Sequence, residues 1–184
     1  MTFYHCSPTA GLRILEPRKP ASFDKPARVY MTTLFPMALM YGVRNFEYTY
    51  GYTKDGQIYL EEYSPNAMEE IYRGRSASLY LCGPTVTEST RIPNEAVSPE
   101  KVTVLEEIRI PDVCEALLEQ ERLGTLVIRH YAELSANKLA WIRKVERETI
   151  QKRNLLHRDS PEADYYRTHY PDSWADAQKE QALL

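Results

Sequence analysis

Cysteine and histidine are too sparse and too scattered in this sequence to predict a disulfide framework or a metal site. Cys6, Cys82 and Cys114 lie far apart and form no CxxC pair. A reducing compartment is the simplest interpretation, because structural disulfides persist in oxidising compartments. The four histidines, at positions 5, 130, 157 and 169, lack the spacing of metal ligands, so no bound metal is expected.

Long apolar runs, a leader-like start and glycine-rich nucleotide motifs are also absent from the sequence. No uninterrupted apolar stretch approaches the ~20 residues of a transmembrane helix, so we expect no membrane partner. The opening MTFYHCSPTAG lacks a charged segment followed by an apolar one, which predicts no signal peptide and a cytoplasmic location. Neither GxGxxG nor GxxxxGK[ST] occurs, which argues against a Rossmann fold and a P-loop.

The charge and the length suit an ordinary globular protein. The formal net charge is -3, and without a basic excess nucleic acid is not a favoured partner. A chain of 184 residues can bury a core and fits one domain with an appendage. The 14 tyrosines stand out, because a ring with a polar tip suits the walls of a pocket.

Strand-like segments dominate before residue 112 and helix-like segments dominate after it. The expected strands cover residues 2–6, 28–32, 57–63, 78–82, 95–97 and 102–110. The expected helices cover residues 36–41, 113–123 and 135–157, and the tail after residue 159 should pack against the core or fray. This layout predicts an α+β fold with a core at residues 1–112 and a mainly helical extension at residues 113–184.

Three short segments resemble, in order, the ADP-ribosyltransferase superfamily in its His–Tyr–Glu branch. That branch includes the diphtheria-toxin-like enzymes, the poly-ADP-ribose polymerases and DNA-modifying bacterial toxins. YHCS at residues 4–7 is similar to the family's HG[ST], VYMTT at 29–33 is similar to its second motif, and NEAVSPEKVTV at 94–104 looks like the strand that presents its glutamate. The resemblance covers residues 3 to about 110 and implies a split β-sheet core that binds NAD.

The resemblance implies that Glu95, His5 and Tyr30 are catalytic and that NAD is the substrate. Breaking the nicotinamide–ribose bond builds positive charge on the anomeric carbon, which a carboxylate near the 2′-hydroxyl can stabilise, and this would be the role of Glu95. His5 would position the nicotinamide-side ribose, and Tyr30 would stack on the nicotinamide ring. ADP-ribose would pass to a macromolecular or small-molecule acceptor, which the sequence does not specify.

Four further residues are expected to bind NAD. The backbone of Cys6, where the family has glycine, would pair with the nicotinamide amide, although its side chain enters a tight space. Ser7 would contact the adenine-side ribose, or only end the strand. Arg18 and Arg28 would contact the diphosphate, because a guanidinium matches phosphate geometry, or would be solvated loop residues.

The position of the acidic residue has alternatives. Glu69 and Glu70, with Glu62 behind them, follow a tyrosine-rich strand, and the similar rifampin-modifying enzymes use an acidic residue in an earlier loop. We prefer Glu95 because a β segment follows it closely.

The candidate site residues as a group also have other interpretations. The three catalytic candidates could be a histidine bonded to a backbone carbonyl, a core aromatic residue and a turn-capping carboxylate. A catalytically silent relative that binds a nucleotide or a protein is suggested by Cys6. An enzyme resembling the RNA 2′-phosphotransferases would need paired arginines near His5, for which Arg13, Arg18 and Arg28 are the local candidates.

Overall fold

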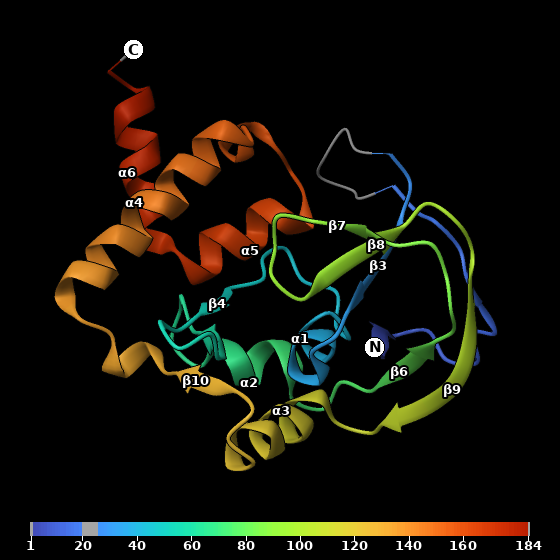
Figure 1. Ribbon diagram of the computed structural model, residues 1–184. Coiled ribbons are helices and arrows are strands. Elements are labelled where there is room, and N and C mark those ends of the chain that lie inside the picture. The colour runs from blue at the N-terminus through green and yellow to red at the C-terminus, as the bar shows by residue number, and fades with distance from the viewer. Residues whose placement is uncertain (1, 20–25, 184) are drawn as a thin grey trace. The chain divides into compact units, whose positions relative to one another are not determined.

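The computed structural model describes residues 2–19 and 26–183 (Figure 1). The chain forms two compact units. The first unit comprises Met1–Tyr48, Tyr52–Ile58 and Met68–Val127. The second comprises Thr49–Gly51, Tyr59–Ala67 and Ile128–Leu184. Each unit has its own set of packed elements.

The first unit is built on a seven-stranded antiparallel sheet with the order β2-β9-β6-β1-β3-β8-β7. Its strands in chain order are β1 (Phe3–Ser7), β2 (Ile14–Leu15), β3 (Val29–Thr32), β6 (Ala77–Cys82), β7 (Glu88–Ser89), β8 (Glu95–Ser98) and β9 (Val102–Ile110). Most of these segments are rich in β-branched and aromatic residues, which fit a pleated, half-buried surface.

Strand β1 has very different neighbours on its two sides. It pairs with β6 along its whole length, from Phe3 opposite Cys82 to Ser7 opposite Ser78. With β3 it shares one register pair within the described residues, Tyr4 opposite Thr32. The sheet is therefore continuous on the β6 side of β1 and opens on the β3 side.

Both faces of this sheet are covered by apolar groups. Helix α1 (Phe35–Met40) packs on β1, β3 and β6, with Pro36 in its first turn and residues 36–40 buried. Helix α3 (Val113–Arg122) packs on α1, and the Asp112 carboxylate caps it by accepting from the Glu115 N–H at 3.2 Å. A second buried cluster includes Met31, Tyr80 and Val102. Successive side chains of a strand point to opposite faces of the sheet, so the strands contribute to a layer of core on each face.

The second unit is mostly helical. Its helices are α4 (Ala136–Lys152), α5 (Pro161–His169) and α6 (Pro171–Gln181), with short 3-10 turns at Tyr131–Glu133 and Leu155–His157. They enclose a cluster that includes Ile150, Tyr166 and Trp174. A three-stranded sheet of order β10-β5-β4 combines β4 (Tyr50–Tyr52), β5 (Ile58–Glu61) and β10 (Val127–Arg129), and most of its residues belong to this unit. The remaining helix, α2 (Ala67–Tyr72), follows β5 in the chain.

The α+β class is confirmed, and each of the two compact units is made of several segments of the chain. Helix α3 belongs to the first unit because it packs on α1, and residues 59–67 belong to the second. The predicted strands match β1, β3, β5, β6, β8 and β9 to within one or two residues. The described residues contain no helix that is both long and apolar enough to cross a bilayer.

One prediction for the C-terminal part needs correction. The helix expected at residues 135–157 ends at Lys152, because Asn154 adopts a left-handed backbone conformation with φ 54°. The tail, by contrast, packs rather than frays and forms helices α5 and α6. Ser160 caps α5 by accepting from the Ala163 N–H at 3.2 Å, and Pro161 and Pro171 lie in the two first turns.

Candidate functional site

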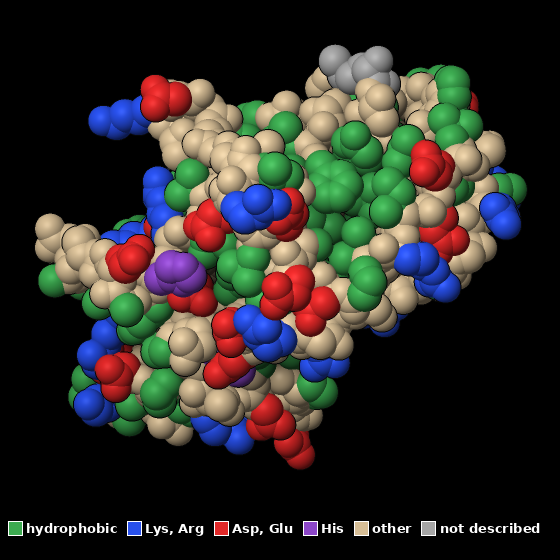
Figure 2. Space-filling model, turned by 90° about the horizontal axis from the view of Figure 1, so that it is seen from below, with side chains coloured by type: hydrophobic (Ala, Val, Ile, Leu, Met, Phe, Trp, Pro, Cys, Tyr) green, Lys and Arg blue, Asp and Glu red, His purple; other side chains and the backbone are tan. Residues whose placement is uncertain are grey.

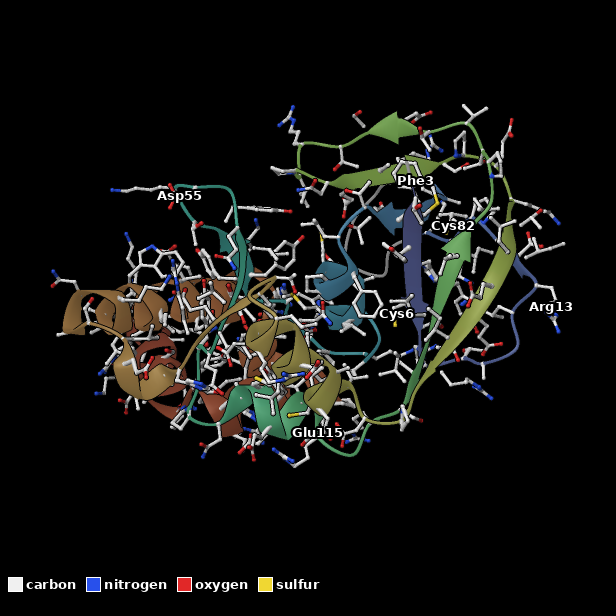
Figure 3. The ribbon with its side chains drawn as sticks, turned by 60° about the horizontal axis from the view of Figure 1, so that its bottom comes forward. Phe3, Cys6, Arg13, Asp55, Cys82 and Glu115 are labelled. Atoms are coloured by element: carbon white, nitrogen blue, oxygen red, sulfur yellow. The ribbon has the colours of Figure 1, made fainter. Side chains whose placement is uncertain are left out.

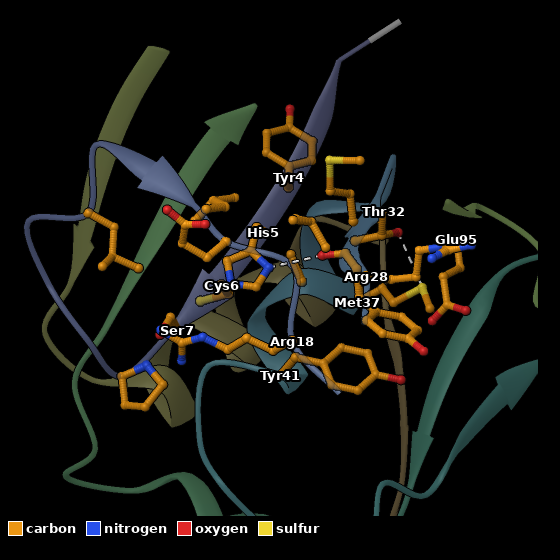
Figure 4. A pocket seen from close by; sticks show the side chains of 18 of the residues that line it. Tyr4, His5, Cys6, Ser7, Arg18, Arg28, Thr32, Met37, Tyr41 and Glu95 are labelled. Atoms are coloured by element: carbon orange, nitrogen blue, oxygen red, sulfur yellow. Dashed lines mark hydrogen bonds between the residues drawn. The ribbon is translucent and has the colours of Figure 1, made fainter. Parts of the chain in front are cut away.

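A pocket of about 540 Å³ lies in the first unit, with walls from β1, β3, the region of α1 and the first residue of β8 (Figure 4). Its volume falls in the range of about 300–1,000 Å³ that small-molecule sites occupy. The structure brings every proposed site residue to this lining: His5, Cys6, Ser7, Arg18, Arg28, Tyr30 and Glu95. Residues remote in the sequence meet here because β1, β3 and β8 are neighbouring strands.

His5 is tethered across the opening between β1 and β3. Its Nδ1 lies 2.9 Å from the Tyr30 carbonyl oxygen, which can only accept, so Nδ1 carries the proton and Nε2 is the acceptor. Burial lowers the pKa of the imidazole; the Tyr30 carbonyl opposes this effect, and the Arg18 charge adds to it. The bond to a backbone carbonyl fits the alternative that His5 is only a structural histidine. It also leaves the ring neutral, with the Nε2 lone pair able to accept a hydrogen bond.

Tyr80 on β6 supports both His5 and the adjoining wall. The two rings lie opposite each other on paired strands, with centroids 6.4 Å apart and planes 27° from parallel. The Tyr80 hydroxyl donates to the Thr9 carbonyl at 2.6 Å and accepts from the Leu12 N–H at 3.3 Å. The chain that follows β1 is thereby held in place beside the imidazole.

Tyr30 and Glu95 lie on adjacent strands on the other side of the opening. Glu95 is the first residue of β8 and pairs with Thr32 of β3. Burial raises the pKa of Tyr30, the Glu95 carboxylate raises it further, and Arg28 opposes both. The phenol is therefore protonated in the neutral range, and a negative charge lies close enough to influence it.

Cys6 occupies space that Gly42, just after α1, leaves open. A Cβ atom at Gly42 would come within 2.9 Å of the Cys6 Sγ, and Figure 3 shows this thiol on the α1 side of β1. The glycine at position 42 thus makes room for the Cys6 side chain. Burial raises the pKa of the Cys6 thiol to about 12, so it is not a thiolate nucleophile at neutral pH.

The pocket lining carries more positive than negative charge. The basic side chains are Arg18, Lys19, Arg28 and Arg44, and the acidic ones are Glu16 and Glu95. Two backbone hydrogen bonds, of 3.0 and 3.1 Å, join Arg18 to Arg28, and the Arg28 guanidinium also lies 3.4 Å from Glu88. Two guanidinium groups on one wall suit an anionic ligand such as a phosphate or a diphosphate.

Sequence reasoning missed two aromatic residues of the pocket. Tyr41, which ends α1, and Tyr48 both line it, with ring centroids 4.7 Å apart. The abundance of tyrosine was the only available signal, because a helix of six residues shows no periodicity that would place its last ring. Together with Tyr30 they give the pocket a strongly aromatic wall.

The rival acidic residues lie elsewhere. Glu69 and Glu70 are exposed on α2, and within the described residues neither lines the pocket. Glu69 instead pairs with Arg73 at 2.7 Å. Glu62 belongs to the second unit, where its buried carboxylate accepts from the Tyr131 N–H at 3.0 Å. Arg13 is an exposed residue outside the pocket lining.

The face of the molecule drawn in Figure 2 shows no charge pattern that indicates a ligand. On the face drawn in Figure 2, acidic and basic side chains are interspersed and do not form a field of one sign. No group of three or more His, Cys, Asp or Glu side chains in residues 2–19 and 26–183 is arranged to hold a metal ion. Comparisons of the chain with protein families, with curated proteins and with solved structures find no match.

Proposed function

We propose that this protein is an NAD-dependent ADP-ribosyltransferase. The observation that carries the proposal is that His5, Tyr30 and Glu95, on three neighbouring strands, line one pocket. The opening of the sheet between β1 and β3 further supports an ADP-ribosyltransferase-like split-sheet core over residues 3–110. The acceptor of ADP-ribose is a macromolecule or a small molecule whose class these residues do not define.

The pocket groups match the parts of NAD by their chemistry. Arg18 and Arg28 supply guanidinium groups for the diphosphate. Tyr30 and Tyr41 supply flat apolar faces for the nicotinamide ring. His5 accepts a hydrogen bond from a ribose hydroxyl through Nε2, since Nδ1 is already engaged.

The reaction exchanges one bond at the anomeric carbon of the nicotinamide ribose. The carbon–nitrogen bond breaks, and its electron pair leaves with nicotinamide, which becomes neutral. Positive charge grows on the ribose carbon, and the Glu95 carboxylate stabilises it electrostatically. A nucleophile of the acceptor then forms the new bond to the same carbon and releases its proton to the solvent.

Nicotinamide release from NAD tests the proposal. The full chain should release nicotinamide, and Glu95→Gln should reduce the rate by about 100-fold to 1,000-fold, the usual cost of removing one group that stabilises transition-state charge. Glu69→Gln and Glu70→Gln are matched controls on the exposed helix α2 and should retain the wild-type rate. Release that survives Glu95→Gln would contradict the site assignment, and lack of release by the wild-type chain would contradict the activity.

Two alternatives keep the same pocket. The backbone bridge between Arg18 and Arg28 brings paired arginines to the His5 pocket, as an RNA 2′-phosphotransferase-like enzyme would need. Mass spectrometry on a 2′-phosphorylated oligonucleotide incubated with NAD and the protein would reveal loss of the phosphate. A catalytically silent binding module would instead bind NAD or ADP-ribose in calorimetry without turnover.

A further inference from the structure

The turn before β8 is held in an unusual backbone conformation. Asn94 has φ 63°, in the left-handed region, which asparagine tolerates better than most residues. The turn closes when the Glu95 N–H donates to the Ile92 carbonyl at 3.2 Å. Because Glu95 comes directly after Asn94, the conformation of this turn sets the direction in which the carboxylate leaves the backbone.

Thr33, just after β3, fastens the turn from one side. Its N–H donates to the Asn94 carbonyl at 3.0 Å, and its hydroxyl donates to the Asn94 Oδ1 at 3.2 Å. The backbone bond continues the β3–β8 ladder one step past the pair of Thr32 and Glu95, and the hydroxyl adds a side-chain hydrogen bond at the same step. The turn is thereby connected to the strand that carries Tyr30.

Tyr52 fastens the turn from a second direction. Its hydroxyl donates to the Pro93 carbonyl at 2.6 Å and lies 3.7 Å from the Met37 sulfur. Burial raises the pKa of Tyr52, a hydrogen bond with Asn94 opposes this, and the Glu95 carboxylate raises it again. The phenol therefore keeps its proton in the neutral range and remains a donor.

We infer that Tyr52 and Thr33 are positioning residues that clamp the Pro93–Asn94 turn and so hold Glu95 at the reacting end of the pocket. This inference rests on the proposed function, because it assigns the clamp to the transferase reaction. Neither residue lines the pocket within the described part of the chain, so both act through Glu95. Small displacements of a catalytic group weaken catalysis strongly, because the group must meet the developing charge at close range.

The clamp predicts a loss of kcat without a loss of substrate binding. Tyr52→Phe removes one hydroxyl and should lower kcat for nicotinamide release by about 10-fold to 100-fold, since misplacement of about 1 Å has an effect of this size. KM for NAD, and the affinity for NAD measured by calorimetry, should match the wild type. Thr33→Val should act in the same direction, and Thr33→Ser, which keeps the hydroxyl, should restore kcat.

Tyr59→Phe is the matched control. It removes a hydroxyl from the neighbouring strand β5, where the ring packs against Arg129 in the second unit, and kcat should not change. A melting temperature equal to that of the wild type would show that the fold of a variant is intact. Wild-type kcat in an intact Tyr52→Phe variant, or a raised KM with an unchanged kcat, overturns the clamp alone. Lack of nicotinamide release by the wild-type chain overturns the proposed function and the clamp together.

Discussion

The two sides of strand β1 differ in what they contribute to the protein. Toward β6, every residue of β1 has a partner, and the neighbouring Leu79 and Tyr80 are fully buried. Toward β3, one pair closes the ladder and a pocket begins where the strands separate. Strand β1 thus pairs along its whole length with the buried strand β6 on one side, and its residues 4–7 line the pocket.

This difference leads to separate expectations for stability and for binding. On the closed side, burial of apolar area is the dominant favourable term, so truncation there should weaken folding. On the open side, His5 and Tyr30 are only partly buried, Arg18 is exposed, and all three residues line the pocket. Changes on the open side should alter ligand binding more than folding.

The largest expected effect lies on the closed side, at Leu79. Leu79→Ala removes a fully buried side chain opposite Cys6 and should lower the free energy of unfolding by about 2–5 kcal/mol. Leu105→Ala on β9 is the matched control, because that side chain is 65% exposed, and it should cost less than about 0.5 kcal/mol. Chemical denaturation measures both. Equal losses in the two variants would show that β6 does not form the core.

The next effect concerns the contact that accommodates Cys6. Gly42→Ala would place a methyl group 2.9 Å from the Cys6 Sγ and 3.0 Å from the Ala77 Cβ, and should destabilise the fold by about 1–3 kcal/mol. Adding Cys6→Ala should return part of that loss, because it relieves the closest of three contacts, the third being with the Leu39 carbonyl oxygen at 3.0 Å. A double-mutant cycle with no coupling between the two positions would mean that Gly42 does not make room for the thiol.

The smallest expected effect is the titration of His5. Its folded-state pKa is lowered from the ordinary 6.5, so the unfolded chain takes up the proton more readily. The stability contribution is complete above pH 6.5 and declines as the pH falls from there toward the lowered value. NMR titration of the imidazole should give a midpoint below 6.5, and a midpoint at or above 6.5 would contradict the tethered, desolvated ring.

The sequence predicts the longer strands of the first unit well, for a physical reason. Segments such as VYMT and SLYLC are apolar and β-branched or aromatic, so local propensity and burial agree. His5, Tyr30 and Glu95 belong to β1, β3 and β8, and their placement on one pocket follows from the order of those strands. Their chemical roles remain a proposal.

The parts that the sequence did not predict depend on tertiary packing. The assignment of α3 to the first unit depends on its packing on α1, which no local pattern in the sequence predicts. The end of α4 is set by one left-handed asparagine, Asn154, in an otherwise helical pattern. The last two helices bury Tyr166 and Trp174 against α4, although their periodicity in the sequence is weak.

The bond between the His5 Nδ1 and the Tyr30 carbonyl limits what this imidazole can do. A histidine that relays protons takes one up at one nitrogen and gives one away at the other, so both nitrogens must be able to exchange. At His5 one nitrogen is committed to the main chain of the neighbouring strand. The ring is therefore a fixed reference point for a bound hydroxyl, and any proton that it takes up or gives back must pass through Nε2.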